Sequence, residues 1–448
     1  MVPDRVIWIW LSLALGAGSK IPNKLFASFD TLAEIYSSPK ERFLEIEGVN
    51  EVIAEKLADK DVSRAENILS VCIKRRWGLI TYGDKAYPRR LKSIPDPPLV
   101  LYYRGRFIDL NDQVCVAVVG TRRMTEYGEG QAYSLSYSMA SGGALIVSGL
   151  ALGCDSMAAN GALDAGAPTV AVLGCGIDRI YPAEHKTLAE HIMRSGMIMT
   201  EYTPGEQPLG FHFPARNRII SGLSQGTVVI EAPVGSGALI TARTALLQGR
   251  DLFAVPGDLR DENSAGCNEL IKGGARVVTS VSDIMSVYEF TYPHRISVSA
   301  AERAESSLKK NAGQETAKLR GVSSRQLKEK EPKEKEKKPE KLQKSKPVSE
   351  LPKATANAPE AENTSSYSFR RDREEAERIK NAKKESATEL PITDREREIL
   401  SLIKRDGSTP DELTGDGRSA SDVMSALTVL EILGCVAAVP GGRYIKTQ

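Results

Sequence analysis

The chain contains 448 residues, which is too long for one ordinary domain, so we expect two or three folded units joined by linkers. Hydrophobic residues make up 41% of the sequence, enough for apolar cores, and the basic and acidic residues nearly cancel to a formal net charge of +2. This balance excludes overall charge as a sign of a polyanionic partner, so only local clusters of cations can indicate one.

The six cysteines form no C-x-x-C pair, and no histidine lies at zinc-ligand spacing from them. Most of them lie in apolar or glycine-rich runs, where a reduced and buried thiol is the ordinary state. We therefore expect reduced cysteines and no metal site, a pattern that fits a reducing cytoplasm.

Residues 1–75 are predicted to form a small helical unit. The apolar run 6–15 is too short to span a bilayer, and the single arginine before it is balanced by Asp4, so a buried helix is favoured over a signal peptide. Glycine-containing turns at 16–19 and 47–50 separate short helices, as in a helix-hairpin-helix or sterile-alpha-motif-like module. Such turns can direct N–H groups toward a DNA backbone, or serve only as turns, and both roles stay open.

Residues 76–290 are predicted to form an α/β domain. The stretch 99–103 follows a proline-rich turn and is expected to pair with the core sheet. Apolar strands then alternate with helical stretches. The predicted strands are 114–119, 144–148, 169–173, 197–201, 227–231, 251–255 and 276–280, with helices such as 126–140, 184–195 and 236–248 between them. This alternation predicts an extended Rossmann-like, doubly wound parallel sheet that binds ligands at the carboxyl ends of its strands.

The loop after the strand 114–119 reads GTRRMT. Gly120 closes the strand, and Thr121 and Thr125 can cap the helix that follows. A tight turn from strand to helix leaves unpaired backbone N–H groups, which together with the helix dipole and the cations Arg122 and Arg123 attract an anion. Phosphate is the predicted ligand of this loop.

A later loop, FHFPARNRIISG, places two arginines on either side of Asn217, directly after an aromatic pair. Guanidinium groups hold phosphates and aromatic rings stack on bases, which is the combination that single-strand binding uses. For Arg218, an ion pair inside the sheet edge is an equally good interpretation. Asp155, in the loop after the strand 144–148, is expected to cap the next helix.

The usual nucleotide fingerprints are missing from the sequence. It contains no G-x-x-x-x-G-K-[ST] run, and its first parallel strand does not open into G-x-G-x-x-G, so neither a P-loop ATPase nor an NAD-binding enzyme is supported. The histidines have no partners that indicate a triad or a metal. Cationic loops without a nucleophile or base favour binding over catalysis, and no cofactor is expected.

After residue 290 the composition changes. Residues 291–392 are dense in Lys, Glu, Ser, Ala and Pro, which predicts a disordered charged linker. Residues 393–448 predict a winged helix, with three helices and a two-stranded wing around Pro440-Gly441-Gly442. The predicted third helix, 420–433, has no basic residue before its end and is a poor reader of the major groove, so a protein contact and duplex binding both stay open.

At these loops the sequence resembles the DNA processing protein A family (DprA, also called Smf). The resemblance covers most of the chain and is carried by ordered blocks. These are YPRRL, IPDPPLVLYYRG, VAVVGTRRMTEYG, LIVSGLALGCD, AVLGCGIDRIYPAEH, FPARNRIISGLS, EAPVGSGALITARTALLQGRDLFAVPG and SAGCNELIKGGA, followed by the winged helix. The long Lys/Glu linker is an insertion that the resemblance does not explain.

The resemblance implies a cytoplasmic, non-enzymatic recombination mediator in natural transformation. Such a protein binds and protects incoming single-stranded DNA, helps to load the RecA recombinase, and works as a homodimer, without a membrane or a cofactor. The DNA-binding residues that the matching motifs imply are Gly120, Thr121, Arg122, Thr125, Arg216, Asn217, Arg218, Gly235, Ser236 and Gly237. One departure is visible: Ala159 stands where the family pattern G-x-D-x-x-A-H-x-G-A-L has its histidine.

Two other functions are compatible with parts of this pattern. A nucleotide-processing hydrolase of the lysine-decarboxylase-like group would share this Rossmann variant, but its P-G-G-x-G-T-x-x-E run corresponds here to PVGSGALI, which has no carboxylate. A protein-interaction scaffold that scarcely touches DNA is the second alternative. Salt-sensitive binding of single strands separates the mediator from both.

Overall fold

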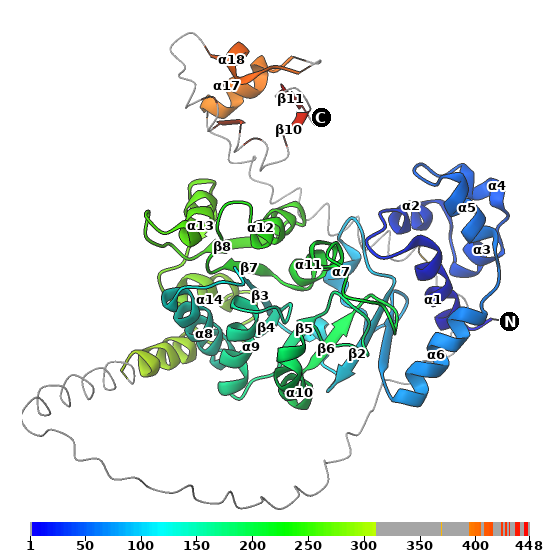
Figure 1. The fold of residues 1–448 in the computed structure, drawn as a ribbon, viewed down its shortest axis with the longest axis horizontal. Helices are drawn as coiled ribbons and strands as arrows, with labels where there is room; N and C mark the ends of the chain where they lie inside the picture. The colour runs from blue at the N-terminus through cyan, green and yellow to red at the C-terminus, as the bar shows by residue number, and fades with distance from the viewer. Residues whose placement is uncertain are drawn as a thin grey trace, which may run out of the picture.

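The computed structural model contains a nine-stranded sheet flanked by helices, with an N-terminal helical unit at one edge (Figure 1). It describes residues 2–310, 369, 394–404, 407–414, 423, 426, 427, 430, 435–439 and 443–446. The strands are β1 (Gly78–Thr81), β2 (Val100–Gly105), β3 (Cys115–Val119), β4 (Leu145–Ser148), β5 (Thr169–Val172), β6 (Met197–Thr200), β7 (Gly226–Val229), β8 (Asp251–Ala254) and β9 (Arg276–Val277).

The sheet has the order β1-β2-β6-β5-β4-β3-β7-β8-β9. Strands β3 to β9 pair in parallel, whereas β2 runs antiparallel to both β6 and β1. The chain adds strands on one side of β3 as far as β6 and then crosses to β7 on the other side. This reversal between β3 and β7 is the topological switch point, where open parallel sheets bind ligands. The predicted doubly wound sheet is confirmed.

The central strand β3 is buried on both faces, as its uninterrupted apolar run predicts. Val114, Val116 and Val118 join one apolar cluster with side chains of α8 and α9, whereas Cys115, Ala117 and Val119 join a second with side chains of α11 and α12. Figure 1 shows α8 (Glu126–Ser141), α9 (Cys154–Asp164) and α10 (Lys186–Ser195) on one side of the sheet. On the opposite side lie α11 (His212–Leu223), α12 (Gly237–Leu247) and α13 (Glu262–Lys272).

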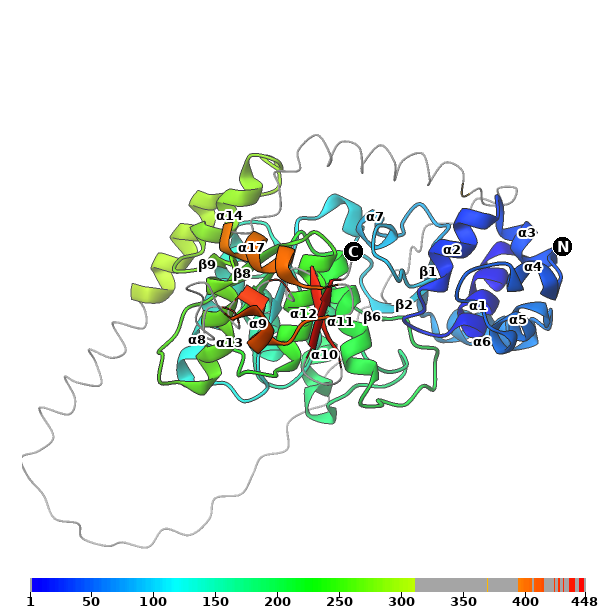
Figure 2. The ribbon, with the colours of Figure 1, turned by 90° about the horizontal axis from the view of Figure 1, so that it is seen from above.

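The N-terminal unit consists of six short helices, as predicted. They are α1 (Asp4–Leu15), α2 (Ile21–Ser28), α3 (Leu32–Ser37), α4 (Lys40–Leu44), α5 (Glu51–Ala58) and α6 (Ser63–Arg75). The apolar helix α1 is buried over most of its length. Its Trp8 ring lies 5.6 Å from that of Tyr82, just after β1, so this unit and the β1 edge share one apolar cluster. Figure 2 shows the helical unit beside β1 and β2. A short helix, α7 (Arg89–Lys92), lies between β1 and β2.

The folded unit extends past residue 290, where the charged linker was predicted to begin. After α14 (Ser282–Glu289), Ile296 is buried and residues 298–310 are helical. Ala301 is fully buried in the same apolar cluster as α8, and Ser297 N donates a hydrogen bond of 2.9 Å to Gly142 O. Helical structure therefore continues past the predicted linker start, and the mostly polar segment contributes Ile296 and Ala301 to the apolar cluster.

The C-terminal part contains α17 (Asp394–Leu402), α18 (Pro410–Leu413) and the antiparallel pair β10 (Val436–Val439) and β11 (Arg443–Lys446). These strands confirm the predicted wing. Most of the predicted third helix lies outside the described residues, although Val423, Leu427 and Leu430 are buried in a small core with Ile399.

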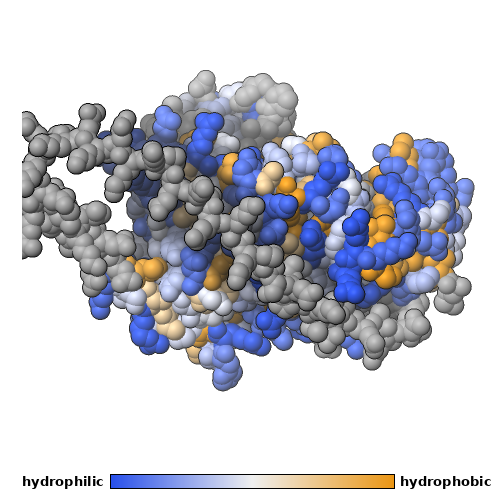
Figure 3. Space-filling view, turned by 60° about the horizontal axis from the view of Figure 1, so that its bottom comes forward, coloured by the Kyte–Doolittle hydropathy of each residue, from blue (hydrophilic) through white to orange (hydrophobic). Residues whose placement is uncertain are grey.

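No helix within the described part of the chain is long and apolar enough to cross a membrane. The face shown in Figure 3 is mainly hydrophilic, with apolar residues in small groups. All six cysteines are free thiols, as expected, and five of them are buried.

Candidate nucleic-acid interface

The loops that follow β3 and β7 lie side by side at the switch point. Thr121 N donates a hydrogen bond of 2.7 Å to Glu231 O, which joins the GTRRMT loop to the start of the EAPVGSG loop. Gly120 fits tightly here, since a Cβ atom on it would lie 2.9 Å from Cys154. Gly153 has a φ of +73°, and its Cβ would lie 2.6 Å from Thr121 O. Glycine is therefore needed at both positions, because the loop after β3 contacts the loop after β4 there.

The two arginines of the first loop are exposed. The Arg122 guanidinium lies over the Phe213 ring, 5.6 Å from its centroid, at the start of α11. Arg123 N donates to Thr121 Oγ1 at 3.2 Å, so the loop backbone is held while both guanidinium groups face solvent. Both cations are accessible to solvent, and their contact with a phosphate remains a prediction.

Thr125 caps α8, because its Oγ1 accepts a hydrogen bond of 3.1 Å from Gly128 N. The same hydroxyl donates to the carboxylate of Glu231, and Thr125 N donates to that carboxylate at 3.0 Å. Glu231 is 1% exposed, and a Cβ on Gly128 would lie 2.3 Å from its carboxyl group. The protein thus places its own carboxylate at this helix start, and the phosphate contact of Thr125 remains a prediction.

Arg216 points into the protein. Only 3% of the residue is exposed, and its Nη1 donates to Gly149 O at 2.7 Å and to Val172 O. A Cβ on Gly149 would lie 2.4 Å from the guanidinium, so glycine leaves the space that this arginine fills. Burial lowers the pKa of Arg216. Arg216 fastens the start of α11 to the ends of β4 and β5, and its predicted contact with a phosphate remains a prediction.

Arg218 forms a buried ion pair, which is the second of the two roles predicted for it. Its Nη2 lies 2.6 Å from a Glu201 oxygen and its Nε lies 3.2 Å from an Asp96 oxygen. Burial lowers the pKa of Arg218, but Glu201 and Asp96 outweigh burial and raise it overall. Burial also raises the pKa of Asp96 by more than Arg218 lowers it. The guanidinium is held by two carboxylates inside the sheet edge, away from an approaching phosphate.

Asn217 and the GSG turn are more accessible. Asn217 is half-buried, and its Oδ1 accepts a hydrogen bond of 3.2 Å from Arg216 Nε. Ser236 caps α12 by accepting from Ala238 N at 3.2 Å. Gly235, with a φ of +80°, and Gly237 are both exposed, and a Cβ on either would meet no atom within 4 Å. This turn leaves open space at a helix start, where an anion is favoured.

The structure adds two aromatic rings to the predicted site. Phe213 lies between Arg122 and Tyr181, with the two rings 5.3 Å apart, and Tyr181 is 44% exposed. Gly174 makes room for this arrangement, since its Cβ would lie 2.9 Å from the Phe213 ring. We call Arg122, Arg123, Phe213 and Tyr181 the rim cluster. The aromatic pair that precedes the two arginines indicated Phe213, but nothing in the sequence placed Tyr181 beside it.

Asp155 does not form the helix cap that was predicted for it. It lies in the first turn of α9, whose N-cap is Gly153, and its Oδ2 accepts hydrogen bonds from Gly149 N and Ala151 N. The carboxylate therefore fixes the loop after β4. Ala159, at the departure from the family pattern, is buried on the same helix.

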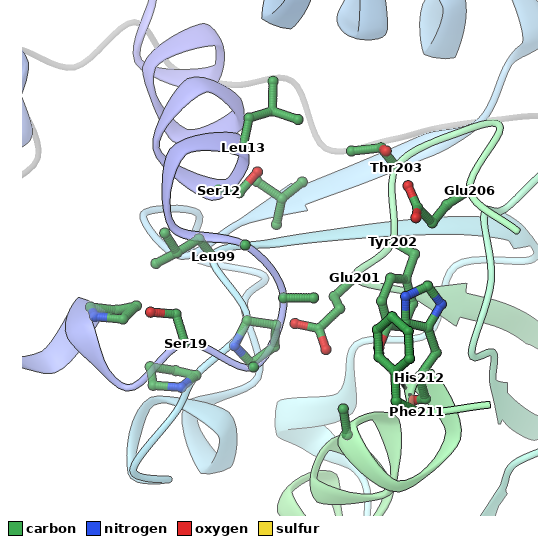
Figure 4. Close-up of a pocket in the computed structure, with 18 of the residues that line it drawn as sticks. Ser12, Leu13, Ser19, Leu99, Glu201, Tyr202, Thr203, Glu206, Phe211 and His212 are labelled. Atoms are coloured by element: carbon green, nitrogen blue, oxygen red, sulfur yellow. Dashed lines mark hydrogen bonds between the residues drawn. The ribbon is translucent and has the colours of Figure 1, made fainter. Parts of the chain in front are cut away.

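A cavity of about 300 Å³ lies apart from the rim cluster, between the N-terminal unit and the sheet (Figure 4). Leu99, Glu201, Tyr202 and His212 line it, and the rings of Tyr202 and His212 stack with centroids 4.1 Å apart. The Glu201 carboxylate is paired with Arg218. Within the described residues, no group of three or more His, Cys, Asp or Glu side chains is placed to hold a metal.

Comparison with known proteins agrees with this architecture. Residues 78–289 match the family described as DNA recombination-mediator protein A, and residues 382–442 match the DprA winged helix domain. DNA processing protein DprA of Streptococcus pneumoniae is 45% identical over 207 residues, which cover 46% of this chain and 73% of the relative. Protein Smf of Synechocystis is 36% identical over 291 residues, which cover 63% of this chain and 72% of the relative.

A solved structure gives the same assignment. The X-ray structure of DprA from Streptococcus pneumoniae aligns with 64% of this chain and 98% of that chain, at 35% identity and a TM-score of 0.55. The ordered sequence blocks, the switch-point loops and these matches have one explanation. This chain belongs to the DNA processing protein A (DprA/Smf) family of recombination mediators.

Proposed function

We propose that this protein binds and protects single-stranded DNA at the carboxyl edge of its sheet and helps to load RecA recombinase onto the strand. The observation that carries the proposal is the rim cluster. Exposed guanidinium groups lie beside two aromatic rings at the switch point, so phosphates and unstacked bases can be held at one place. The open GSG turn on the neighbouring loop offers a second phosphate contact.

The structure divides the candidate residues into two groups. Arg122, Arg123 and the GSG turn are accessible to the strand, whereas Arg216 and Arg218 hold α11 in place beneath it. We infer that Arg216 acts on DNA binding through the position of Phe213, at the start of that helix, whereas Arg218 contributes to stability. Because the accessible contacts are to the backbone, binding is expected to show little sequence preference.

Family membership supports the parts of the proposal that involve partners. The match to the recombination-mediator family supports a role in natural transformation with RecA, and the same membership is our reason for proposing a homodimer. Six free cysteines support a reducing cytoplasm. We propose a binding protein rather than an enzyme, because Glu231 is engaged with the α8 cap and Glu201 with Arg218.

The direct test is fluorescence anisotropy with labelled oligo-dT and with a duplex of equal length. We expect tighter binding of the single strand, and about tenfold weaker binding for Arg122→Ala, since one charge-assisted phosphate contact contributes 1–2 kcal/mol. Arg194→Ala is the matched control, because Arg194 is an exposed arginine at the end of α10, which precedes the amino end of β6. Failure to bind oligo-dT at low salt would contradict the proposal.

The hydrolase alternative is tested on the same preparations. Nucleoside monophosphates are incubated with the protein, and release of ribose phosphate is measured. We expect no turnover. Robust turnover that Arg122→Ala abolishes would favour the enzyme.

A further inference from the structure

Phe369 is buried in the N-terminal unit, although it lies in the segment whose composition predicts a charged linker. The residue is 1% exposed. Its ring stacks on Phe26, with centroids 4.2 Å apart and planes 16° from parallel, and meets Trp8 edge-on at 5.9 Å. A residue far along the chain therefore completes an aromatic cluster of the first helices.

The site that receives Phe369 is built by the N-terminal unit and the start of the sheet domain. Phe26 lies 4.8 Å from Tyr82 and 5.9 Å from Trp8, so the receiving rings already support one another. The backbone takes part as well, since Phe369 N donates a hydrogen bond of 3.0 Å to Asp30 O. We call Trp8, Phe26, Tyr82 and the Asp30 carbonyl the aromatic socket. It recognises a side chain and a main-chain amide together, which is how a peptide segment is held specifically.

The sequence around Phe369 supports a dedicated contact. Between Tyr292 and Tyr444, Tyr367 and Phe369 are the only aromatic residues, in a stretch dominated by Lys, Glu, Ser and Ala. Such a stretch has few large apolar side chains, so a single buried aromatic ring is able to anchor it.

We propose that the segment around Phe369 is a docking motif that the aromatic socket binds in cis, so that it tethers the winged helix to the N-terminal unit. Lys310 and Asp394 are 84 positions apart in the sequence, but Phe369 and Asp394 are only 25 positions apart. A fully extended chain spans at most about 3.5 Å per residue, so docking reduces the reach of the winged helix from about 290 Å to about 90 Å. The socket thereby sets how far the C-terminal domain travels from the rest of the protein. This inference does not depend on DNA binding.

The experiment is hydrogen–deuterium exchange of the full chain, followed by mass spectrometry of peptides that contain residue 369. We expect the Phe369 amide to exchange about tenfold more slowly than in an undocked chain, because a buried hydrogen bond exchanges only after local opening. Phe369→Ala should abolish this protection and speed exchange around Asp30. Leu351→Ala, which removes an apolar side chain elsewhere in the predicted linker, is the control and should change neither.

Two further measurements test the proposal. A synthetic peptide of residues 362–375, added to the Phe369→Ala protein, should restore protection around Asp30, whereas the same peptide with alanine at 369 should not. Protection in the unmodified chain should be independent of protein concentration. Protection that falls on dilution would show that a second copy supplies Phe369 and would overturn docking in cis. Unprotected amides at 369 in the unmodified chain would overturn the motif itself.

Discussion

Replacing Arg218 with methionine separates a structural arginine from a DNA-binding one. The side chains of Arg218 and Glu201 are 6% and 5% exposed, and that of Asp96 is 20% exposed. Arg218→Met keeps the length and apolar volume of the side chain but leaves two carboxylates facing each other without their cation. Removing one partner of a buried ion pair costs about 3–5 kcal/mol, so we expect the free energy of unfolding to fall by that amount.

The assay is urea denaturation followed by circular dichroism, with the melting temperature as a second readout. A loss of 3–5 kcal/mol corresponds to a decrease in Tm of about 10 °C for a domain of this size. Burial raises the pKa of Asp96 in the folded state, and without the arginine the main opposing interaction is lost. The variant then loses stability as the pH rises through the interval between the unfolded and the folded pKa, so its deficit should be smaller at pH 5 than at pH 8.

A second substitution tests whether the unpaired charge causes the loss of stability. Adding Glu201→Gln to Arg218→Met removes one unpaired charge and should recover part of the stability. The single variant should still bind oligo-dT at temperatures where it is folded. If Arg218→Met unfolds at the urea concentration of the unmodified protein and yet fails to bind oligo-dT, the arginine contacts DNA directly and the structural interpretation is refuted.

Three further changes test other parts of the site and of the fold. Gly149→Ala places a Cβ 2.4 Å from the Arg216 guanidinium, so unfolding should become easier by about 1–3 kcal/mol in urea titrations. Phe213→Ala should weaken oligo-dT binding by about 1–3 kcal/mol in anisotropy titrations, because a base loses its stacking partner. Burial lowers the pKa of Lys60 to about 8, with Asp59 acting in the opposite direction. As the pH rises from about 8 toward 10, the folded chain therefore loses this proton before the unfolded chain does. Relative to Lys60→Gln, its stability should rise by about 1 kcal/mol, a value reduced for solvent screening at this half-buried site.

The sheet was predictable because its signal is local. The run 114–119 is apolar at every position and its counterparts are mostly apolar, as strands covered on both faces require. Alternation with helices then implies parallel pairing, and parallel pairing brings the loops after β3 and β7 to one edge. The residues of the candidate site were therefore identified from motifs before their positions were known.

The direction of each arginine was not predictable. Arg122 and Arg216 have the same chemistry, but only the packing of α11 on β4 and β5 turns Arg216 inward, toward Gly149 O and Val172 O. Glu231 follows a strand 106 residues after Thr125, so nothing local marks it as the anion that fills the α8 start. Such contacts depend on tertiary structure, which periodicity does not report.

The predicted linker shows that composition does not detect individual buried contacts. A polar, Lys/Glu-rich composition predicts that a segment has too little apolar surface to fold. The composition is an average over many residues. Ala301 and Phe369 are single buried contacts inside the predicted linker, and an average does not detect them. Ala301 lies beside Gly142, at the end of α8, and the partners of Phe369 lie on the N-terminal helices, both far away in sequence.

The central claim is that exposed cations of the rim cluster bind the backbone of a single strand. The most direct measurement is the slope of log K against log salt concentration for oligo-dT, compared between the unmodified protein and Arg122→Ala/Arg123→Ala. Each lost contact with a single-strand phosphate lowers the magnitude of that slope by about 0.7, so we expect a decrease of about 1.4. An unchanged slope, at unchanged stability, would contradict the claim that these two arginines hold the strand.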